Sequence, residues 1–557
     1  MEYRYKMLAP TSQFNPLNLE HLEAQFVPTS DDIRYGYNPF QLNSFQYYQP
    51  VLKLLFDINA QNYNTTQLNH RYHINDLATV VDTTTHEVLQ RPIFIKHSPL
   101  LDPIRYMIGR YDTESTDIRT LPTMDGAKFP KLADTNNASY VDGLFSLLGS
   151  KLTELYNFRH AVGYYGSFSA VQKKFKMNIA DDYEYLSSSN FFMDNVNKLF
   201  RVSKGRVSSI SSLNSRGHRN KLVITGEDDV IVDVSLLDVL APEVELAPLE
   251  EIYVQVKDDT KDDDSDDEDE SEEDNESEEE DEDESDEDED EDDSEDEDES
   301  ENSETHKEEP AIFAYVDNFP VQMICLEKCD GTLDELFVNE ELDDETGASA
   351  LFQVVMILLT YQTAYKFTHN DLHTNNIMYV STNEEFLYYK YNDVCYKVPT
   401  YGRIFKIIDF GRSIYTYKGQ TFCSDSFAPG GDAATQYNFP PYYNNKQPFL
   451  EPNYSFDLCR LGCSIHDFII EDKPRGELQK TVHRWCLDDK KASVLYKKNG
   501  SERYPDFKLY KMIAKTVHEH TPQNQLSFPF FSQFKISSVP ADGAANMMDI
   551  TAIPSYA

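Results

Sequence analysis

One segment of the sequence cannot contribute to a core, and it divides the rest of the chain. Residues 258–309 are almost wholly Asp, Glu and Ser, and this composition cannot bury enough apolar surface to offset the entropy lost on folding. We therefore predict an acidic disordered insertion. Strand-like runs flank it, at Glu251–Val256 before it and at Ala311–Val316 and Val321–Leu326 after it. Strands on both sides indicate an insertion within one sheet rather than a boundary between domains.

The remaining sequence has enough apolar content for a substantial core. Hydrophobic residues make up 40% and aromatic residues 13% of the 557 positions, so most of the chain must fold. The formal net charge is −48, but residues 261–300 hold 32 of the 98 acids and one Lys. The other 66 acids face 49 bases, so the folded part is moderately acidic. A surface that binds nucleic acid needs clustered Lys and Arg, and we expect none here.

The cysteines predict reduced thiols. They are odd in number, contain no C-x-x-C pair and lie at Cys325, Cys329, Cys395, Cys423, Cys459, Cys463 and Cys486. The two closely spaced pairs lie in apolar runs, where a buried thiol packs well, which favours packing over a zinc site. The N-terminus lacks an apolar signal region, and the longest apolar run, Leu351–Thr360, is too short to cross a bilayer. We expect a soluble intracellular protein without a membrane partner.

Hydrophobic periodicity predicts a mixed architecture. Leu89–Lys96 has strand character, Tyr140–Tyr156 has helical spacing, and residues 161–168 return to an extended pattern. Ala348–Phe367 is helical and almost free of charge, which indicates burial on several faces. Strands with one helix come first and helices dominate later, an order typical of a two-lobed α+β protein.

Two motifs carry the chemistry. The first is His369-Asn-Asp371-Leu-His373-Thr-Asn-Asn376-Ile, and the second, downstream, is Lys-Ile-Ile-Asp409-Phe-Gly. An Asp can orient the proton of an incoming hydroxyl, and an Asn with a second Asp can supply hard oxygen ligands to Mg²⁺ on a triphosphate. The pair of motifs resembles the H-x-D-L-x-x-x-N and D-F-G motifs of the protein-kinase superfamily.

This resemblance implies a two-lobed kinase-like fold that uses ATP and Mg²⁺. It implies that Asp371 is the catalytic residue, that Asn376 and Asp409 are metal ligands, and that His369 and His373 support the catalytic loop. Ser455–Gly462 resembles the family's D-x-x-x-x-G segment, which implies that Asp457 holds the backbone of that loop.

Two further matches concern the nucleotide. Residues 323–333 resemble the strand that runs into the kinase hinge, which implies that the backbone of Glu327 to Cys329 faces adenine, with Leu326 behind it. Pro92-Ile-Phe-Ile-Lys96 resembles the V-A-I-K strand, which implies that Lys96 contacts the phosphates and is held by an acid on the next helix. Asp142 and Glu154 are the candidates, and spacing favours Asp142. An exposed strand Lys is the plainer alternative for Lys96.

Several positions depart from the kinase pattern. The only glycine before Lys96 is Gly36, so no glycine-rich loop covers the phosphates. Asn370 replaces the Arg that usually precedes the catalytic Asp, which disfavours activation by loop phosphorylation. His373 stands where protein kinases usually have Lys, as in small-molecule kinases of the aminoglycoside phosphotransferase type. Residues 384–403 are predicted to be an insertion between the two motifs.

The predicted architecture has four parts. An N-terminal extension (1–79) precedes a β-rich kinase-like N-lobe (80–326) that contains the acidic insertion, and a mainly helical C-lobe (327–534) is followed by a tail (535–557). With the missing glycine loop, the chain resembles the divergent kinase-like proteins of giant nucleocytoplasmic DNA viruses, which is compatible with packaging in a virion.

The leading hypothesis is an ATP- and Mg²⁺-dependent serine/threonine protein kinase. The alternatives are a pseudokinase that serves as a binding or virion-structural protein, and a small-molecule kinase. The acidic insertion is expected either to attract a basic protein or to act only as a solubilising arm.

Overall fold

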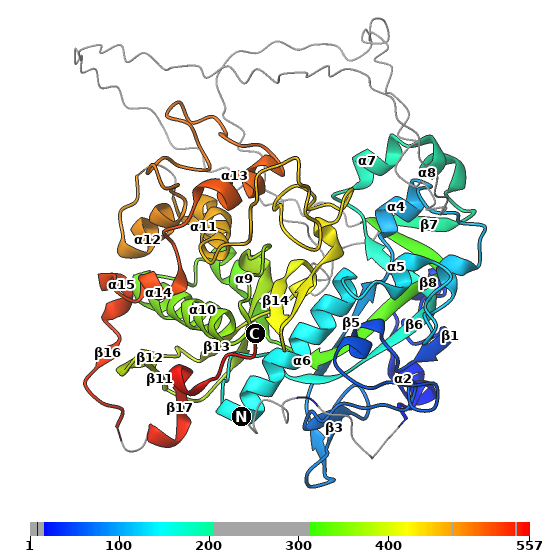
Figure 1. The fold of residues 1–557 in the computed structure, drawn as a ribbon, viewed down its shortest axis with the longest axis horizontal. Coiled ribbons are helices and arrows are strands. Elements are labelled where there is room, and N and C mark those ends of the chain that lie inside the picture. The colour runs from blue at the N-terminus through cyan, green and yellow to red at the C-terminus, as the bar shows by residue number, and fades with distance from the viewer. Residues whose placement is uncertain (1–7, 9–15, 205–311, 471–472, 541–542) are drawn as a thin grey trace, which may run out of the picture. The chain divides into compact units, whose positions relative to one another are not determined.

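The computed structural model describes residues 8, 16–204, 312–470, 473–540 and 543–557. The acidic insertion and the expected strand Glu251–Val256 lie outside these residues. All described residues belong to one compact unit, and Figure 1 shows a mixed α+β fold with several antiparallel sheets.

The largest described sheet is antiparallel and contains the strand that carries Lys96. Its order is β1-β6-β8-β5, and β7 pairs with β8. The strands are β1 (Leu42–Gln46), β5 (Ile93–Pro99), β6 (Tyr164–Asn178), β7 (Phe200–Lys204) and β8 (Ile312–Glu327). β5 lies at one edge, and no other described strand pairs with its free side. Helix α6 (Ala138–Tyr156) packs on this sheet, so closely that a Cβ added at Gly143 would clash with Gln322 of β8.

β8 corrects one prediction. The two strands expected at 311–316 and 321–326 are one continuous strand, because the turn-like residues between them form an irregularity instead of a reversal. Asn318 takes a left-handed φ of 58°, and β8 continues its pairing with β6 on both sides, at Asp317↔Lys174 and Phe319↔Gln172. The register is the same on both sides of Asn318, so this residue distorts the strand locally without ending it.

One small sheet accompanies the large one in the described N-terminal part. It is formed by β2 (Tyr72–Ile74), β3 (Thr79–Asp82) and β4 (Val88–Gln90). The single strand expected at 89–96 is therefore divided between β4 and β5, and the break falls at Arg91-Pro92, where proline cannot donate to a ladder. Short helices surround these strands: α2 (Leu19–Gln25), α3 (Ser30–Tyr35), η1 (Pro50–Leu54), α4 (Pro103–Met107), η2 (Asp117–Arg119), α5 (Pro130–Ala133), α7 (Tyr183–Ser187) and α8 (Asn190–Asn195).

The expected buried helix is α10 (Asp344–Tyr365). It is long and apolar enough to cross a membrane, but 94% of its most apolar stretch is buried inside the protein, so it is a core helix. Figure 1 shows it beside α14 and α15. The other helices here are α9 (Leu333–Val338), α11 (Phe456–Ile469), α12 (Glu477–Trp485), α13 (Lys508–Thr516), α14 (Pro522–Gln525) and α15 (Pro529–Ser532).

The segment between the two sequence motifs contains the predicted insertion. β10 (Ile377–Ser381) pairs directly with β13 (Arg403–Ile407), so the residues between them leave and rejoin the same hairpin. The inserted residues form the hairpin β11 (Phe386–Tyr391) and β12 (Val394–Pro399). β9 (Gly331–Thr332) joins β10 on its other side. After the second motif come η5 (Phe410–Arg412), β14 (Ile414–Tyr417), β15 (Gln420–Cys423) and η6 (Asp425–Phe427).

The C-terminal residues pack against the core, contrary to the prediction of a tail. β16 (Lys535–Ile536) pairs with β12, and β17 (Met547–Asp549) pairs with β11. η7 (Ala544–Asn546) and η8 (Ile550–Ala552) flank β17. Ile550 and Tyr556 are buried, and the Tyr556 N–H donates to the Ala364 carbonyl of α10. Ile550 and Tyr556 are widely spaced among small residues, so hydrophobic periodicity does not detect them.

We predict that Asp343→Ala lowers the free energy of unfolding by about 1 kcal/mol, because the Asp343 carboxylate caps α10 by accepting from the N–H groups of Glu345 and Thr346. Thermal and denaturant melting of the full chain measure the change. Asp343→Asn is the matched control, since Asn caps helices equally well. Equal losses in both variants would contradict the capping role.

Candidate functional site

Three segments that are far apart in the sequence meet at Lys96. Its Nζ lies 2.7 Å from Asp142 Oδ2 on α6 and 2.8 Å from Asp409 Oδ1, just after β13. Of the two acids considered as its partner, Asp142 therefore makes the contact. Glu154 lies elsewhere, where it pairs with Lys151 and accepts from the Arg71 N–H.

The environment keeps Lys96 charged. Burial would lower the pKa of Lys96, but the two carboxylates outweigh burial and raise it above its ordinary value. Burial raises the pKa of Asp142, an effect that the Lys96 ammonium opposes. Burial acts in the same direction on Asp409, but Lys96 outweighs it and lowers that pKa. Asp142 is only 2% exposed, whereas Asp409 is 33% exposed and can face a ligand.

Aromatic packing fixes the second motif against α6. Phe145 of α6 stacks on Phe367, with ring centroids 4.3 Å apart, and meets Phe410 edge-on at 4.7 Å. The Phe410 N–H also donates to Asp142 Oδ1 over 3.1 Å. Asp409 itself has a left-handed φ of 62°, and the N–H groups of its neighbours Ile408 and Phe410 are both hydrogen-bonded.

Asp457 holds the backbone of the first motif. This fully buried carboxylate on α11 accepts from the His369 N–H at 2.9 Å and from the Asn370 N–H at 2.8 Å. His369 Nε2 lies 2.9 Å from the Ile408 carbonyl, which links the first motif to the second. The Asp457 carboxylate thus makes the backbone contact that the resemblance to kinases implied for it.

Asp371 accepts a hydroxyl hydrogen bond within the protein. The Tyr510 hydroxyl of α13 donates to Asp371 Oδ1 over 2.8 Å, and Arg412 Nη1 lies 3.4 Å from Oδ2. Burial would raise the pKa of Asp371, but the Arg412 guanidinium, with Arg460 and the Tyr510 hydroxyl, holds it well below its usual range. Asp371 is therefore ionised at neutral pH, and it is 18% exposed.

Three residues around Asp371 were not predicted from the sequence. Arg412 bridges Asp371 and Asp432, whose carboxylate lies 2.6 Å from its Nη2. Arg460 Nε donates to the Tyr510 oxygen over 2.9 Å, which orients that hydroxyl toward Asp371. Arg412 directly follows the Asp-Phe-Gly motif, so its position offered a signal. Arg460 occupies a variable position of the segment Asp457–Gly462, and Tyr510 belongs to no motif.

Asn370 stands where the resemblance to kinases leads us to expect an Arg, and its side chain makes neutral hydrogen bonds. Its Nδ2 donates to the Arg412 carbonyl over 3.1 Å, and its Oδ1 accepts from the Tyr437 hydroxyl at 2.7 Å. Both partners lie in the segment that follows the second motif. This segment is thus held by neutral hydrogen bonds at the position where the family usually has a guanidinium.

Asn376 and Asp409 suit a magnesium ion. Asn376 Nδ2 donates to the Asp371 carbonyl over 2.9 Å, and Oδ1 accepts no hydrogen bond from any described residue. The two side chains would supply two hard oxygen ligands, and Mg²⁺ in such sites takes the rest from phosphates and water. No group of three or more His, Cys, Asp or Glu among the described residues is arranged for a metal.

His373 lies beside this pair as a neutral group. It is 5% exposed, and burial lowers its pKa to about 4. Its Nε2 lies 3.1 Å from Asn376 Nδ2. An uncharged imidazole here can orient the amide, but it cannot neutralise a phosphate as the usual Lys would.

The segment expected to be the hinge lies at the end of β8, where the Glu327 carboxylate is paired with a lysine. Glu327 Oε2 lies 2.8 Å from Lys406 Nζ, and burial, which would raise the pKa of Glu327, is outweighed by Lys406, so the pKa is lowered. The Glu327 N–H donates to the Gly163 carbonyl. The backbone of Cys329, by contrast, makes no hydrogen bond to any described residue, so its N–H and carbonyl are available to a planar heterocycle.

A further carboxylate anchors the start of α6. Asp425 Oδ1 accepts from the Ala138 N–H at 3.0 Å, and Asp425 Oδ2 lies 2.5 Å from Lys131 Nζ. The Asp425 N–H donates in turn to the Asn136 carbonyl at 2.7 Å. The segment after the second motif thus holds the same helix that presents Asp142, an arrangement that no sequence motif indicated.

Comparison of the chain with models of known protein families gives no match, and neither does comparison with curated proteins. The interpretation of the site rests on its residues and their geometry.

Proposed function

We propose that the chain is an ATP- and Mg²⁺-dependent phosphotransferase with a two-lobed kinase-like arrangement, and that it phosphorylates Ser or Thr hydroxyls of proteins. The observation that carries the proposal is the contact of Lys96 with both Asp142 and Asp409. Lys96 lies between a buried carboxylate and an accessible one. When the accessible carboxylate binds a metal ion instead, the Lys96 ammonium can bind phosphate oxygens.

The catalytic roles follow from the neighbours of each group. Asp371 is ionised and accepts a hydrogen bond from the Tyr510 hydroxyl. A substrate hydroxyl that replaces the Tyr510 hydroxyl would be oriented in the same way. Lys96 contacts the phosphates. The backbone N–H and carbonyl of Cys329 form hydrogen bonds to the adenine ring. Mg²⁺, when bound by Asn376 and Asp409, would neutralise charge on the transferred phosphoryl group. Positioning and charge neutralisation then supply most of the rate enhancement.

A second candidate is a pseudokinase that binds partners without transferring phosphate. The free edge of β5 favours it, because no described strand pairs with the outer side of the strand that carries Lys96, where a strand of a phosphate-covering loop would be expected. Such a site would bind nucleotide weakly. The two candidates differ in whether any phosphate transfer depends on Asp371.

We predict that Asp371→Asn lowers phosphate transfer by roughly 10²–10⁴-fold, because the amide cannot accept the proton of the attacking hydroxyl. Transfer of radiolabel from ATP to a mixed peptide substrate, with small alcohols as a parallel arm, measures the rate. A Mg·ATP-dependent rise in melting temperature should persist in the variant. Transfer that does not depend on Asp371, or no thermal shift in either protein, would favour the pseudokinase; turnover of small alcohols alone would refute a protein substrate.

We predict that Lys96→Met destabilises the protein by about 3–5 kcal/mol, because it leaves the Asp142 carboxylate buried without its cation. The double variant Lys96→Met/Asp142→Leu should recover most of the stability, while transfer stays abolished. Thermal melting and the radiolabel assay separate the two effects. If the double variant is no more stable than the single one, the ion pair does not hold α6 as we describe.

We predict that Arg412→Gln shifts the acid limb of kcat/KM toward higher pH. Arg412 lowers the pKa of Asp371, and the reactive form is the ionised one, so loss of this charge lets Asp371 protonate at a higher pH. Arg412→Lys keeps the positive charge and serves as the matched control. An acid limb that is identical in wild type and Arg412→Gln would show that Asp371 does not control it.

A further inference from the structure

Tyr510 places a hydroxyl group of the chain itself at Asp371. Its Oη donates to Asp371 Oδ1 over 2.8 Å, and Arg460 Nε donates to the same Oη over 2.9 Å. No other side-chain hydroxyl of the described residues contacts the Asp371 carboxylate. The position that an acceptor hydroxyl must reach beside the proposed base is therefore already occupied.

The fold holds Tyr510 in this position. Figure 1 shows α13 beside α11, and the buried Leu509 and Ile513 of α13 join a hydrophobic cluster shared with α11. The Tyr510 ring stacks on Phe507, with ring centroids 5.4 Å apart. Packing of the helix and of the ring thus directs the hydroxyl at Asp371.

Two guanidinium groups flank the Tyr510 ring. The Cζ atoms of Arg460 and Arg412 lie 5.1 Å and 5.9 Å from its centroid. Arg412 is paired with two carboxylates. Arg460 forms no ion pair with a carboxylate in the described part of the chain, and its two Nη groups donate to no residue there. Arg460 therefore has donors left for an anion at Tyr510 Oη, and phosphate oxygens accept such donors strongly.

The Tyr510 hydroxyl also has a base beside it. Burial raises the pKa of Tyr510, so the phenol keeps its proton at neutral pH and becomes a nucleophile only when a base accepts that proton. Asp371 is ionised and accepts the hydrogen bond of this same hydroxyl. The proton thus has a direct path to a carboxylate.

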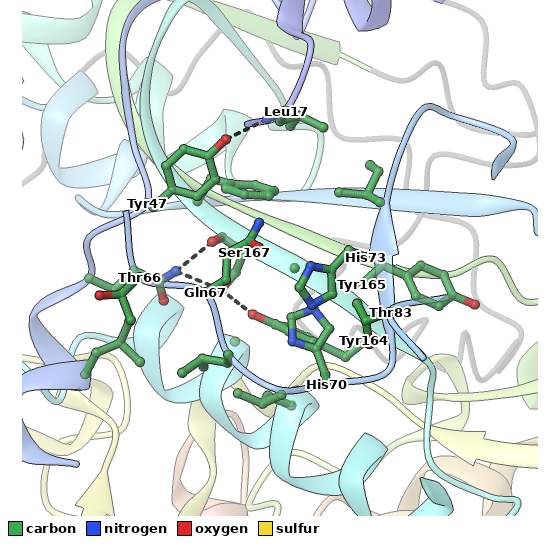
Figure 2. A pocket seen from close by; sticks show the side chains of 18 of the residues that line it. Leu17, Tyr47, Thr66, Gln67, His70, His73, Thr83, Tyr164, Tyr165 and Ser167 are labelled. Carbon is green, nitrogen blue, oxygen red and sulfur yellow. Dashed lines mark hydrogen bonds between the residues drawn. The ribbon is translucent and has the colours of Figure 1, made fainter. Parts of the chain in front are cut away.

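The largest described cavity lies away from this contact. It has a volume of about 320 Å³ and follows α6 (Figure 2). Its lining includes Leu144 and Leu147 of α6 but no residue of α13 or of the two motifs. A compound bound in this cavity would therefore not displace Tyr510 from Asp371.

We infer that Tyr510 is a phosphorylation site, modified by the active site of its own molecule; the inference rests on the proposed phosphotransferase function. Tyr510 Oη attacks the γ-phosphorus of ATP. The Oη–P bond forms, the bond from that phosphorus to the bridging oxygen of ADP breaks, and the phenol proton passes to Asp371. Fixed positioning replaces the recognition of a separate substrate, so a phenol can react at a site proposed for Ser and Thr.

The product differs from the starting state at Asp371. The phosphorylated Oη has no proton to donate, so its hydrogen bond to the Asp371 carboxylate is lost. The phosphate is an anion next to a carboxylate, and the free Nη groups of Arg460 bind it.

The experiment incubates the purified full chain with Mg·ATP, with and without the mixed peptide substrate, and maps phosphate by mass spectrometry. Wild type should gain phosphate at Tyr510. Tyr504, a half-buried tyrosine just before α13 whose hydroxyl accepts from Arg503, should gain none. Asp371→Asn should lower the rate at Tyr510 by roughly 10²–10⁴-fold. Since the reaction occurs within one molecule, dilution should not change the fraction modified per minute.

Tyr510→Phe should lose this phosphate while the Mg·ATP-dependent rise in melting temperature persists. The mapping on wild type does not depend on whether this variant folds.

The outcomes separate the inference from the proposed function. Peptide transfer that depends on Asp371, with Tyr510 unmodified, would overturn the inference and leave the proposed function intact. No transfer to either the peptide or the chain would overturn both. Equal phosphorylation of Tyr510 in wild type and Asp371→Asn, or a modified fraction that rises with protein concentration, would show that another molecule modifies Tyr510 and would overturn the inference.

Discussion

The buried carboxylate of Asp142 is the constraint on which the arrangement of the site depends. An ionised carboxylate that is 2% exposed needs partners, because leaving water costs several kcal/mol. Its two oxygens find them in Lys96 Nζ and the Phe410 N–H, on β5 and η5. Since these partners are 46 and 268 residues away along the chain, satisfying one carboxylate brings three distant segments together. The position of α6 follows from this requirement.

Other carboxylates around the site also accept hydrogen bonds from backbone N–H groups. Asp457 accepts two backbone N–H groups of the first motif, and Asp425 accepts one at the start of α6. In each case a side chain from a later segment pairs a backbone group that a loop or a helix end leaves without a partner. Carboxylates suit this role because charge-assisted hydrogen bonds are stronger than neutral ones. The two motifs and the start of α6 are thus held by carboxylates from later segments of the chain.

Sequence reasoning succeeded where the signal is local. Helical periodicity predicted the helix that the structure has as α6, and spacing favoured Asp142 over Glu154 as the partner of Lys96. It failed where the outcome depends on distant pairing. Asn318 looks like a turn residue, yet β6 keeps β8 continuous on both sides of it.

The same limit applies to side chains that reach the site from afar. Tyr510 donates to Asp371 from a helix 139 residues downstream, and no pattern in α13 signals this contact. The C-terminal residues pack through Ile550 and Tyr556 although their neighbours are small. His70 and His73 are three positions apart, and only the fold shows that their rings stack, with centroids 4.0 Å apart.

The contact between Asp425 and the first turn of α6 has a consequence for control. Many switches attach or remove a negative group at such a position, and a phosphatase or kinase then decides whether a helix is docked. Here the negative group is encoded in the gene. A phosphatase cannot remove a carboxylate, so this contact with the start of α6 is present whenever the chain is folded.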